Sequence, residues 1–167
     1  MKKSARLFKS ILVLFIAISL IQCKKDDDTP EVINSVMMNE NNFIVATANI
    51  IGVSIGDDGH TGITLISGSG TQTTTLTIDV ESFTQATIEG DYAYPEESGK
   101  KILDDWLTNY TVYNGSTMES SSLESGEVSI TNNGGNNYTI VMNLEMVDGI
   151  NFNGTYTGEF QVLFSNQ

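Results

Sequence analysis

The chain contains one cysteine and one histidine, so few nucleophilic or acid–base mechanisms are open to it. Cys23 ends an apolar leader, and His60 ends the run Asp57-Asp58-Gly59-His60. No motif supports a Ser-His-Asp or Cys-His arrangement, in which the nucleophile and the histidine base lie within hydrogen-bond reach of each other. One turn rarely supplies a closed metal coordination sphere, and no second cluster of ligands occurs in the sequence. We expect an exposed hairpin tip at His60, with no metal and no cofactor.

Two pairs of carboxylates have the spacing that places both side chains on one face of a strand. They are Asp79 with Glu81, and Glu89 with Asp91. A glycosidase needs only two carboxylates at a suitable separation, so each pair is a candidate for hydrolytic chemistry. Apolar residues alternate with both pairs, which places the carboxylates on the solvated face. We expect surface charge, and a carboxylate-dependent hydrolase is the least favoured function.

An aromatic cluster is the best candidate for ligand binding. Trp106, Tyr110 and Tyr113 follow the acidic pair Asp104-Asp105. Exposed aromatic rings have an apolar face and, in tyrosine and tryptophan, a polar group, so with neighbouring carboxylates they can stack on sugars and hydrogen-bond to them. For Trp106 itself the favoured interpretation is that it fills the core, because most of the surface of a large aromatic side chain is usually buried.

Residues 1–22 have the pattern of a secretory signal peptide. Four basic side chains at positions 2, 3, 6 and 9 precede an apolar run from Ile11 to Ile21. The run is shorter than the roughly 20 residues that a bilayer-spanning helix needs, so a permanent transmembrane anchor is less favoured. We expect this segment to be removed.

The end of the leader, Leu20-Ile21-Gln22-Cys23, resembles the lipobox of bacterial type II signal peptides. Gln22 is larger than the residue usual before the cysteine. The resemblance implies that the Cys23 thiol is diacylated and that Cys23 becomes the first residue. Two or more acyl chains hold a protein stably at a membrane, where one chain is marginal. The alternative is an incidental thiol in an ordinary signal peptide.

The segment after the cysteine resembles the surface-export signal of Bacteroidota lipoproteins. The match is carried by Lys25-Asp26-Asp27, a lysine followed by acidic residues. It implies an outer-membrane lipoprotein exposed at the cell surface. Dense charge and low hydrophobicity forbid a packed core here, so residues 23–30 form the lipidated cysteine and an acidic tether. The alternative is a tether that only keeps the domain off the lipid.

The charge of the mature chain excludes one class of partner. Removing residues 1–22 takes four of the eight basic side chains and none of the 21 acidic ones, which leaves a net charge of −17. Nucleic-acid binding requires Lys and Arg to neutralise phosphates, so nucleic acid is not expected as a partner. The membrane is reached through the lipid anchor, since anionic headgroups would repel the domain.

The C-terminal part has the clearest strand pattern. Apolar residues occupy every second position from Tyr138 to Met146 and again from Ile150 to Phe164, where Gly154 and Gly158 fill the two gaps. This period indicates half-buried antiparallel strands. A three-residue loop, 147–149, pairs Ile140 with Tyr156 and puts both apolar sets on one face, with Gly149 in the left-handed position. Before it, Ile130 is expected opposite Tyr138, across an Asn/Gly turn at 132–136.

Upstream patterns predict further strands at 32–38, 43–53, 63–66, 76–80 and 86–94. Residues 103–110 have apolar positions at helical spacing, but the β-branched and aromatic residues of 106–113 favour a strand. The Ser- and Glu-rich segment from Thr117 to Gly126 is expected to be a mobile loop.

Residues 31–167 are therefore expected to form a single all-β domain. About nine strands joined by short turns suggest an antiparallel meander. A lipocalin-like barrel is favoured because Gly154 and Gly158 face inward on a long last strand, where glycines mark a bend. A two-sheet β-sandwich is the alternative.

The C-terminal segments Gly126-Glu127-Val128-Ser129-Ile130, Tyr138-Thr139-Ile140 and Gly154-Thr155-Tyr156-Thr157-Gly158 are similar to those of small Bacteroidota surface lipoproteins. This resemblance implies a location and a β fold, but no activity.

We expect a non-catalytic outer-membrane surface lipoprotein that acts as a binding or accessory module for a glycan, a small molecule or a protein. The alternative is a lipocalin-like carrier of a small apolar molecule, which would require an interior cavity of several hundred Å³.

Overall fold

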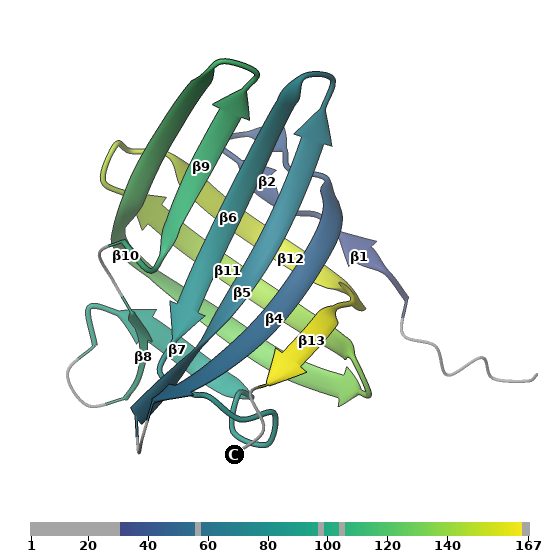
Figure 1. Cartoon of the computed structure of the whole chain (residues 1–167), viewed down its shortest axis with the longest axis vertical. Helices are drawn as coiled ribbons and strands as arrows, with labels where there is room; N and C mark the ends of the chain where they lie inside the picture. The colour runs from purple at the N-terminus through teal and green to yellow at the C-terminus, as the bar shows by residue number, and fades with distance from the viewer. Residues whose placement is uncertain (1–30, 56–57, 97–98, 104–105, 165–167) are drawn as a thin grey trace, which may run out of the picture.

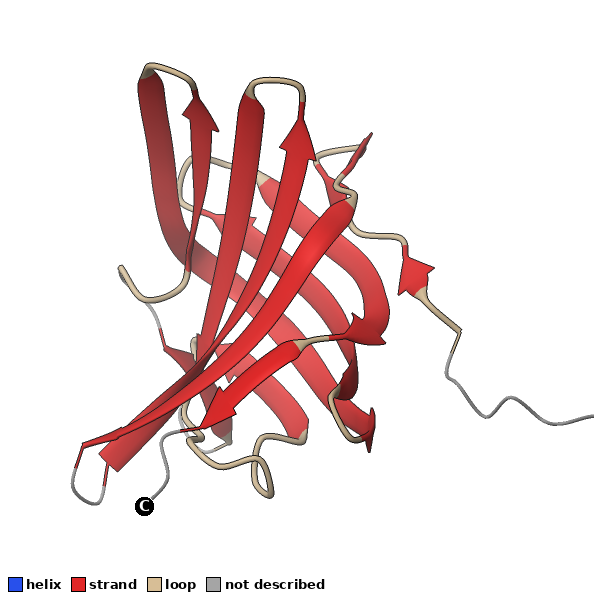
Figure 2. Cartoon of the chain, turned by 45° about the vertical axis from the view of Figure 1, so that its right-hand side comes forward, coloured by secondary structure: helices blue, strands red, loops and turns tan. Residues whose placement is uncertain are grey.

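The computed structural model describes residues 31–55, 58–96, 99–103 and 106–164. This part of the chain is all-β and contains no helix (Figures 1 and 2). Its thirteen strands are β1 (Ile33–Asn34), β2 (Met37–Met38), β3 (Asn41–Asn42), β4 (Val45–Ile55), β5 (Asp58–Ser69), β6 (Gln72–Val80), β7 (Gly90–Tyr94), β8 (Lys100–Leu103), β9 (Asn109–Asn114), β10 (Thr117–Gly134), β11 (Asn137–Met146), β12 (Asn151–Glu159) and β13 (Gln161–Phe164). The all-β prediction is confirmed. The expected number of strands was too low, because short strands of two to four residues separate from the long ones.

All thirteen strands belong to one hydrogen-bonded sheet, which curves so that β4, β5, β6 and β9 lie in front of β11 and β12 (Figure 1). Most pairs are antiparallel, and β13–β4 and β7–β8 are parallel. β12 and β13 are separated by Phe160 alone, yet β12 pairs with β11 whereas β13 pairs with β4. The last segment of the chain therefore contacts both layers.

β10 also joins the two layers, because its first part pairs with β9 and its second part with β7 and β11. The expected loop at 117–126 is wrong, since these residues are the first half of β10. Serine and glutamate have weak strand preferences, but every residue from Thr117 to Ser122 has a partner on β9. Tertiary pairing overrides local propensity here.

The register of the C-terminal hairpin is confirmed. Ile140 lies opposite Tyr156, and Leu144 lies opposite Phe152. The turn is closed by a hydrogen bond of 2.8 Å from the Gly149 N–H to the Met146 carbonyl, and Gly149 has a φ of 82°.

The preceding hairpin differs from the prediction by two residues. Ile130 lies opposite Ile140, and Asn132 lies opposite Tyr138. A bulge between Asn132 and Gly134 makes the turn tighter than the expected five-residue loop. The shift is an even number, so the same side chains still face the core.

The first strands cover the outer edge of β12. Ile33 pairs with Thr157, and Met37 pairs with Asn153. Between them the chain crosses close to Gly154, whose φ is 123°. The Asn34 side chain then reaches β4, where its amide donates to the Val45 carbonyl at 2.9 Å and its oxygen accepts from the Val45 N–H at 3.1 Å.

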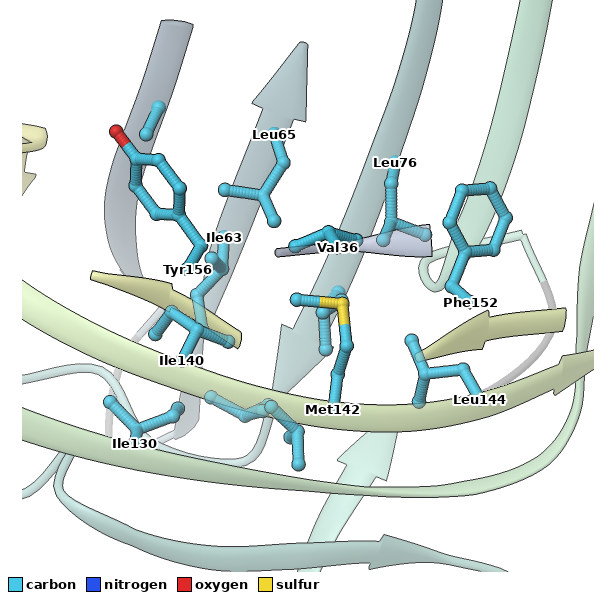
Figure 3. Packing of buried hydrophobic residues seen from close by; sticks show 14 of the residues in the cluster. Val36, Ile63, Leu65, Leu76, Ile130, Ile140, Met142, Leu144, Phe152 and Tyr156 are labelled. Carbon is cyan, nitrogen blue, oxygen red and sulfur yellow. The ribbon is translucent and has the colours of Figure 1, made fainter. Parts of the chain in front are cut away.

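Side chains from both layers fill the space between them (Figure 3). Ile140, Met142 and Leu144 of β11 point toward the side chains of the opposite layer, including Ile63, Leu65 and Leu76. Phe152 is fully buried and has ring-centroid distances of 5.5 Å to Phe43 and 5.6 Å to Tyr110. In the described part of the chain, every buried side-chain nitrogen or oxygen has a hydrogen-bond partner.

Candidate binding site

The sequence-predicted site residues fall into two groups. Cys23, Lys25, Asp26 and Asp27 lie outside the described residues, as do the acidic neighbours at 104–105. Trp106, Tyr110 and Tyr113 are described, and β9 positions the two tyrosines.

Trp106 lies on the surface, in the turn between β8 and β9, with 79% of its residue area exposed. The interpretation of Trp106 as a core side chain is therefore wrong. The turn is held by Asn109, whose side-chain amide donates to the carbonyls of Trp106 and Leu107. Trp106 belongs to this hydrogen-bonded turn and not to a strand, so the alternation of a strand could not predict which way its side chain points.

Tyr110 belongs to the core and not to an exposed patch. It is 5% exposed, and its hydroxyl donates to the Asp148 carboxylate. Burial, together with this hydrogen bond and the charge of Asp148, raises the pKa of Tyr110 to about 12. Burial also acts to raise the pKa of Asp148, but hydrogen bonds from Tyr110 and from the Ile150 N–H outweigh it, so the pKa of Asp148 is lowered. Tyr110 therefore anchors the β11–β12 turn to β9.

Tyr113 lies on the opposite face of β9 from Tyr110, because their positions differ by three, which is an odd number. It is 50% exposed, and its hydroxyl donates to the Gly115 carbonyl at 2.7 Å. Of the three predicted aromatic residues, Trp106 and Tyr113 thus reach the surface.

A shallow groove of about 430 Å³ opens beside Trp106. Its other lining residues are Asn109 of β9 and Ser120, Ser121 and Ser122 of β10. The Ser120 hydroxyl donates to the Tyr110 carbonyl at 2.8 Å, which holds it in place. The serines were missed by the sequence interpretation because they were assigned to a loop. An aromatic ring beside hydroxyl and amide groups can bind a polar, uncharged ligand.

A second site joins His60 to Asp79. The His60 Nδ1 lies 2.6 Å from the Asp79 Oδ1. Asp79 was expected on the solvated face with Glu81, but it is 4% exposed, so that interpretation is wrong. The alternation of β6 places Asp79 on the outer face, as predicted. It is nevertheless covered, because β8 pairs with β6 at this position and the Asp79 N–H donates to the buried Thr108 hydroxyl at 3.0 Å. His60 is half-buried, and so it is not the exposed tip that we expected.

Among the described residues, His60 is the one side-chain partner of the Asp79 carboxyl, and this pairing predicts a pH effect. Burial raises the pKa of Asp79, and the His60 ring opposes this rise. In His60→Ala the pKa of Asp79 in the folded protein would rise further. The variant therefore loses the full amount of stability above this raised pKa, and the loss shrinks as the pH falls toward the pKa of Asp79 in the unfolded chain. We expect a loss of about 2 kcal/mol at pH 7.5 and a smaller loss at pH 5, measured by urea unfolding.

His60→Gln is the matched control, because its amide can still donate to Asp79 and should retain part of the stability. An equal loss for His60→Ala at both pH values would contradict this account of the pair.

A further groove of about 450 Å³ lies over the outer face of β7, β10 and β11. Asp91, Glu96, Glu127 and Lys100 contribute its charged lining. The Lys100 ammonium is already hydrogen-bonded to the Glu89 and Thr87 carbonyls and lies over the Tyr92 ring. Glu89 and Asp91 are exposed, as predicted. This groove is therefore an ordinary charged surface, because the ammonium of Lys100 already binds groups of the protein itself.

Within the described residues, no three histidine, cysteine, aspartate or glutamate side chains are grouped as a metal site would require. The same residues contain no helix of the length and hydropathy needed to cross a bilayer. Comparison of the chain with protein families, with curated proteins and with solved structures found no match.

Proposed function

We propose that this protein is a non-catalytic binding module, attached to the outer membrane through a lipid on Cys23 and exposed at the cell surface. The observation that carries the binding function is Trp106, which stands exposed beside a groove lined by Asn109 and three serines. A large aromatic side chain held in solvent by a braced turn loses hydration favourably when a ligand covers it. No nucleophile and base within that groove lining supports a reaction.

We also propose that the curved sheet is a lipocalin-like barrel. Two observations support this architecture over a two-sheet sandwich. β10 runs from one layer into the other, and the chain does so again between β12 and β13. Each crossing provides a corner at which neighbouring strands stay paired.

The interior supports a binding surface over a lipocalin-like carrier. A carrier needs a lined cavity for its ligand. Here Tyr138, Ile140 and Phe152 are fully buried among other side chains, and aromatic rings of Tyr138, Tyr156 and Phe160 meet edge to face. The grooves described above all lie on the outer surface of the sheet.

The proposed anchor predicts a localisation defect. Cys23→Ala should remove lipidation and release the protein from the outer membrane, since the 11-residue apolar run is too short to span the bilayer. Metabolic labelling with a palmitate analogue and membrane fractionation would measure this. Absence of label on the wild type, with unchanged fractionation of the variant, would refute the lipid anchor.

Trp106 also provides the test of the binding site, because it is the only tryptophan in the chain. A ligand that covers it should shift the intrinsic emission to shorter wavelength. We would titrate the detergent-solubilised protein with neutral oligosaccharides, with peptides and with a fluorescent fatty acid. An emission shift with an oligosaccharide or a peptide supports a surface binding module. Binding of the fatty acid without a shift supports the carrier.

A further inference from the structure

The outer face of β6, β9 and β10 has an unusual composition for so acidic a protein. Leu76 and Tyr110 are paired across β6 and β9 and are buried, so the residues next to them in each strand point outward. From 73 to 77, 109 to 113 and 118 to 122, none of the outward residues is charged. Eight of these nine residues carry a hydroxyl or an amide: Thr73, Thr75, Thr77, Asn109, Thr111, Tyr113, Ser120 and Ser122.

These polar groups are arranged in rows across the three strands. Thr75 pairs with Thr111, which pairs with Ser120, and Thr77, Asn109 and Ser122 form the adjacent row. Neighbouring strands are about 4.8 Å apart, and side chains on one face repeat about every 6.6 Å along a strand. The face is thus a regular array of groups that both donate and accept hydrogen bonds.

Two aromatic rings border this array. Trp106 precedes β9, and Tyr113 lies near its other end on the same outer face. Asn109 and Tyr113 are four residues apart, or about 13 Å along the strand. The Tyr113 hydroxyl is bonded to Gly115 and the Trp106 turn is held by Asn109, so both are partly ordered before a ligand arrives. Such ordering reduces the entropy lost on binding.

We propose that this face binds a neutral polysaccharide, with sugar rings stacked on Trp106 and Tyr113 and sugar hydroxyls bonded to the rows between them. This inference rests on the proposed function and specifies its ligand. A net charge of −17 for the mature chain repels anionic polymers, and the face has no carboxylate among these outward residues to attract a cationic one. The stretch of β9 between Asn109 and Tyr113, about 13 Å long, has room for more than one sugar unit.

Affinity electrophoresis of the detergent-solubilised full chain tests the proposal. Native gels would contain a neutral glucan, a neutral mannan or an anionic polygalacturonate. We expect retardation in at least one neutral gel and none in the anionic gel. Trp106→Ala should weaken binding at least tenfold, and Tyr113→Ala and the double variant Thr111→Val/Ser120→Ala should each weaken it severalfold.

Leu163→Ala is the control, because Leu163 is 64% exposed on β13, outside this face. Its retardation should equal that of the wild type. Unchanged retardation in Trp106→Ala, or retardation only by the anionic polymer, would overturn the proposal. If no neutral polymer retards the protein but a peptide shifts the Trp106 emission, the polysaccharide fails and the binding module stands. If neither occurs, both fail.

Discussion

Met142→Asp is expected to destabilise the domain by about 4 kcal/mol or more, enough to unfold a protein of marginal stability. Met142 lies at the centre of β11, is 3% exposed and points toward the opposite layer (Figure 3). An aspartate there would be buried without a partner, which costs far more than the lost methionine contacts. Urea unfolding of the mature chain would measure the change.

Val141→Asp is the matched control, one residue away on the same strand. Val141 is 46% exposed, so its carboxylate would remain hydrated. We expect a loss of less than about 1 kcal/mol. An equal loss of stability in the two variants would mean that both faces of β11 are buried. It would refute an arrangement in which one face of β11 packs against the core and the other faces solvent.

Gly154→Ala is expected to cost about 3 kcal/mol. Its φ of 123° is a conformation that essentially only glycine adopts. A Cβ at this position would also collide with the Ser35 carbonyl oxygen, which is backbone and cannot move aside as a side-chain end can. The substitution should therefore displace the N-terminal strands from β12.

Gly149→Ala separates the two contributions. Gly149 also has a positive φ, of 82°, but nothing lies within 4 Å of an added Cβ. Backbone strain alone should cost about 1 kcal/mol. Thermal unfolding of both variants, with amide hydrogen exchange at residues 33–38, would measure the effects. Similar losses and unchanged exchange would show that the crossing at Ser35 does not constrain Gly154.

The C-terminal hairpin was predictable because two local signals agree. Strict alternation over β11 and β12 requires an odd loop, and Gly149 supplies the left-handed residue that such a loop needs. The first half of β10 was not predictable in this way. Its serines and glutamates acquire strand structure only by pairing with β9, a contact that local propensity does not report.

The candidate site was predictable only in part. The aromatic residues were identifiable by type, but which of them are exposed depends on the start of β9 at Asn109. A start at 106 would have made Trp106 a strand residue. Likewise, the alternation of β6 places Asp79 outward, and only the adjacent β8 and the buried Thr108 explain why it is not solvated.

The contact of Asn34 with Val45 bears on how copies of this protein behave when crowded. A sheet with free backbone N–H and C=O groups along its edge can add a strand from a neighbour and start aggregation. The Asn34 amide occupies both backbone groups of Val45 at the start of β4, ahead of the stretch that β13 pairs. β3, at the end of the strand order, is only two exposed asparagines long. Under the proposed lipid anchoring, many copies would share one membrane plane, and we expect these edges to let them lie side by side without fusing their sheets.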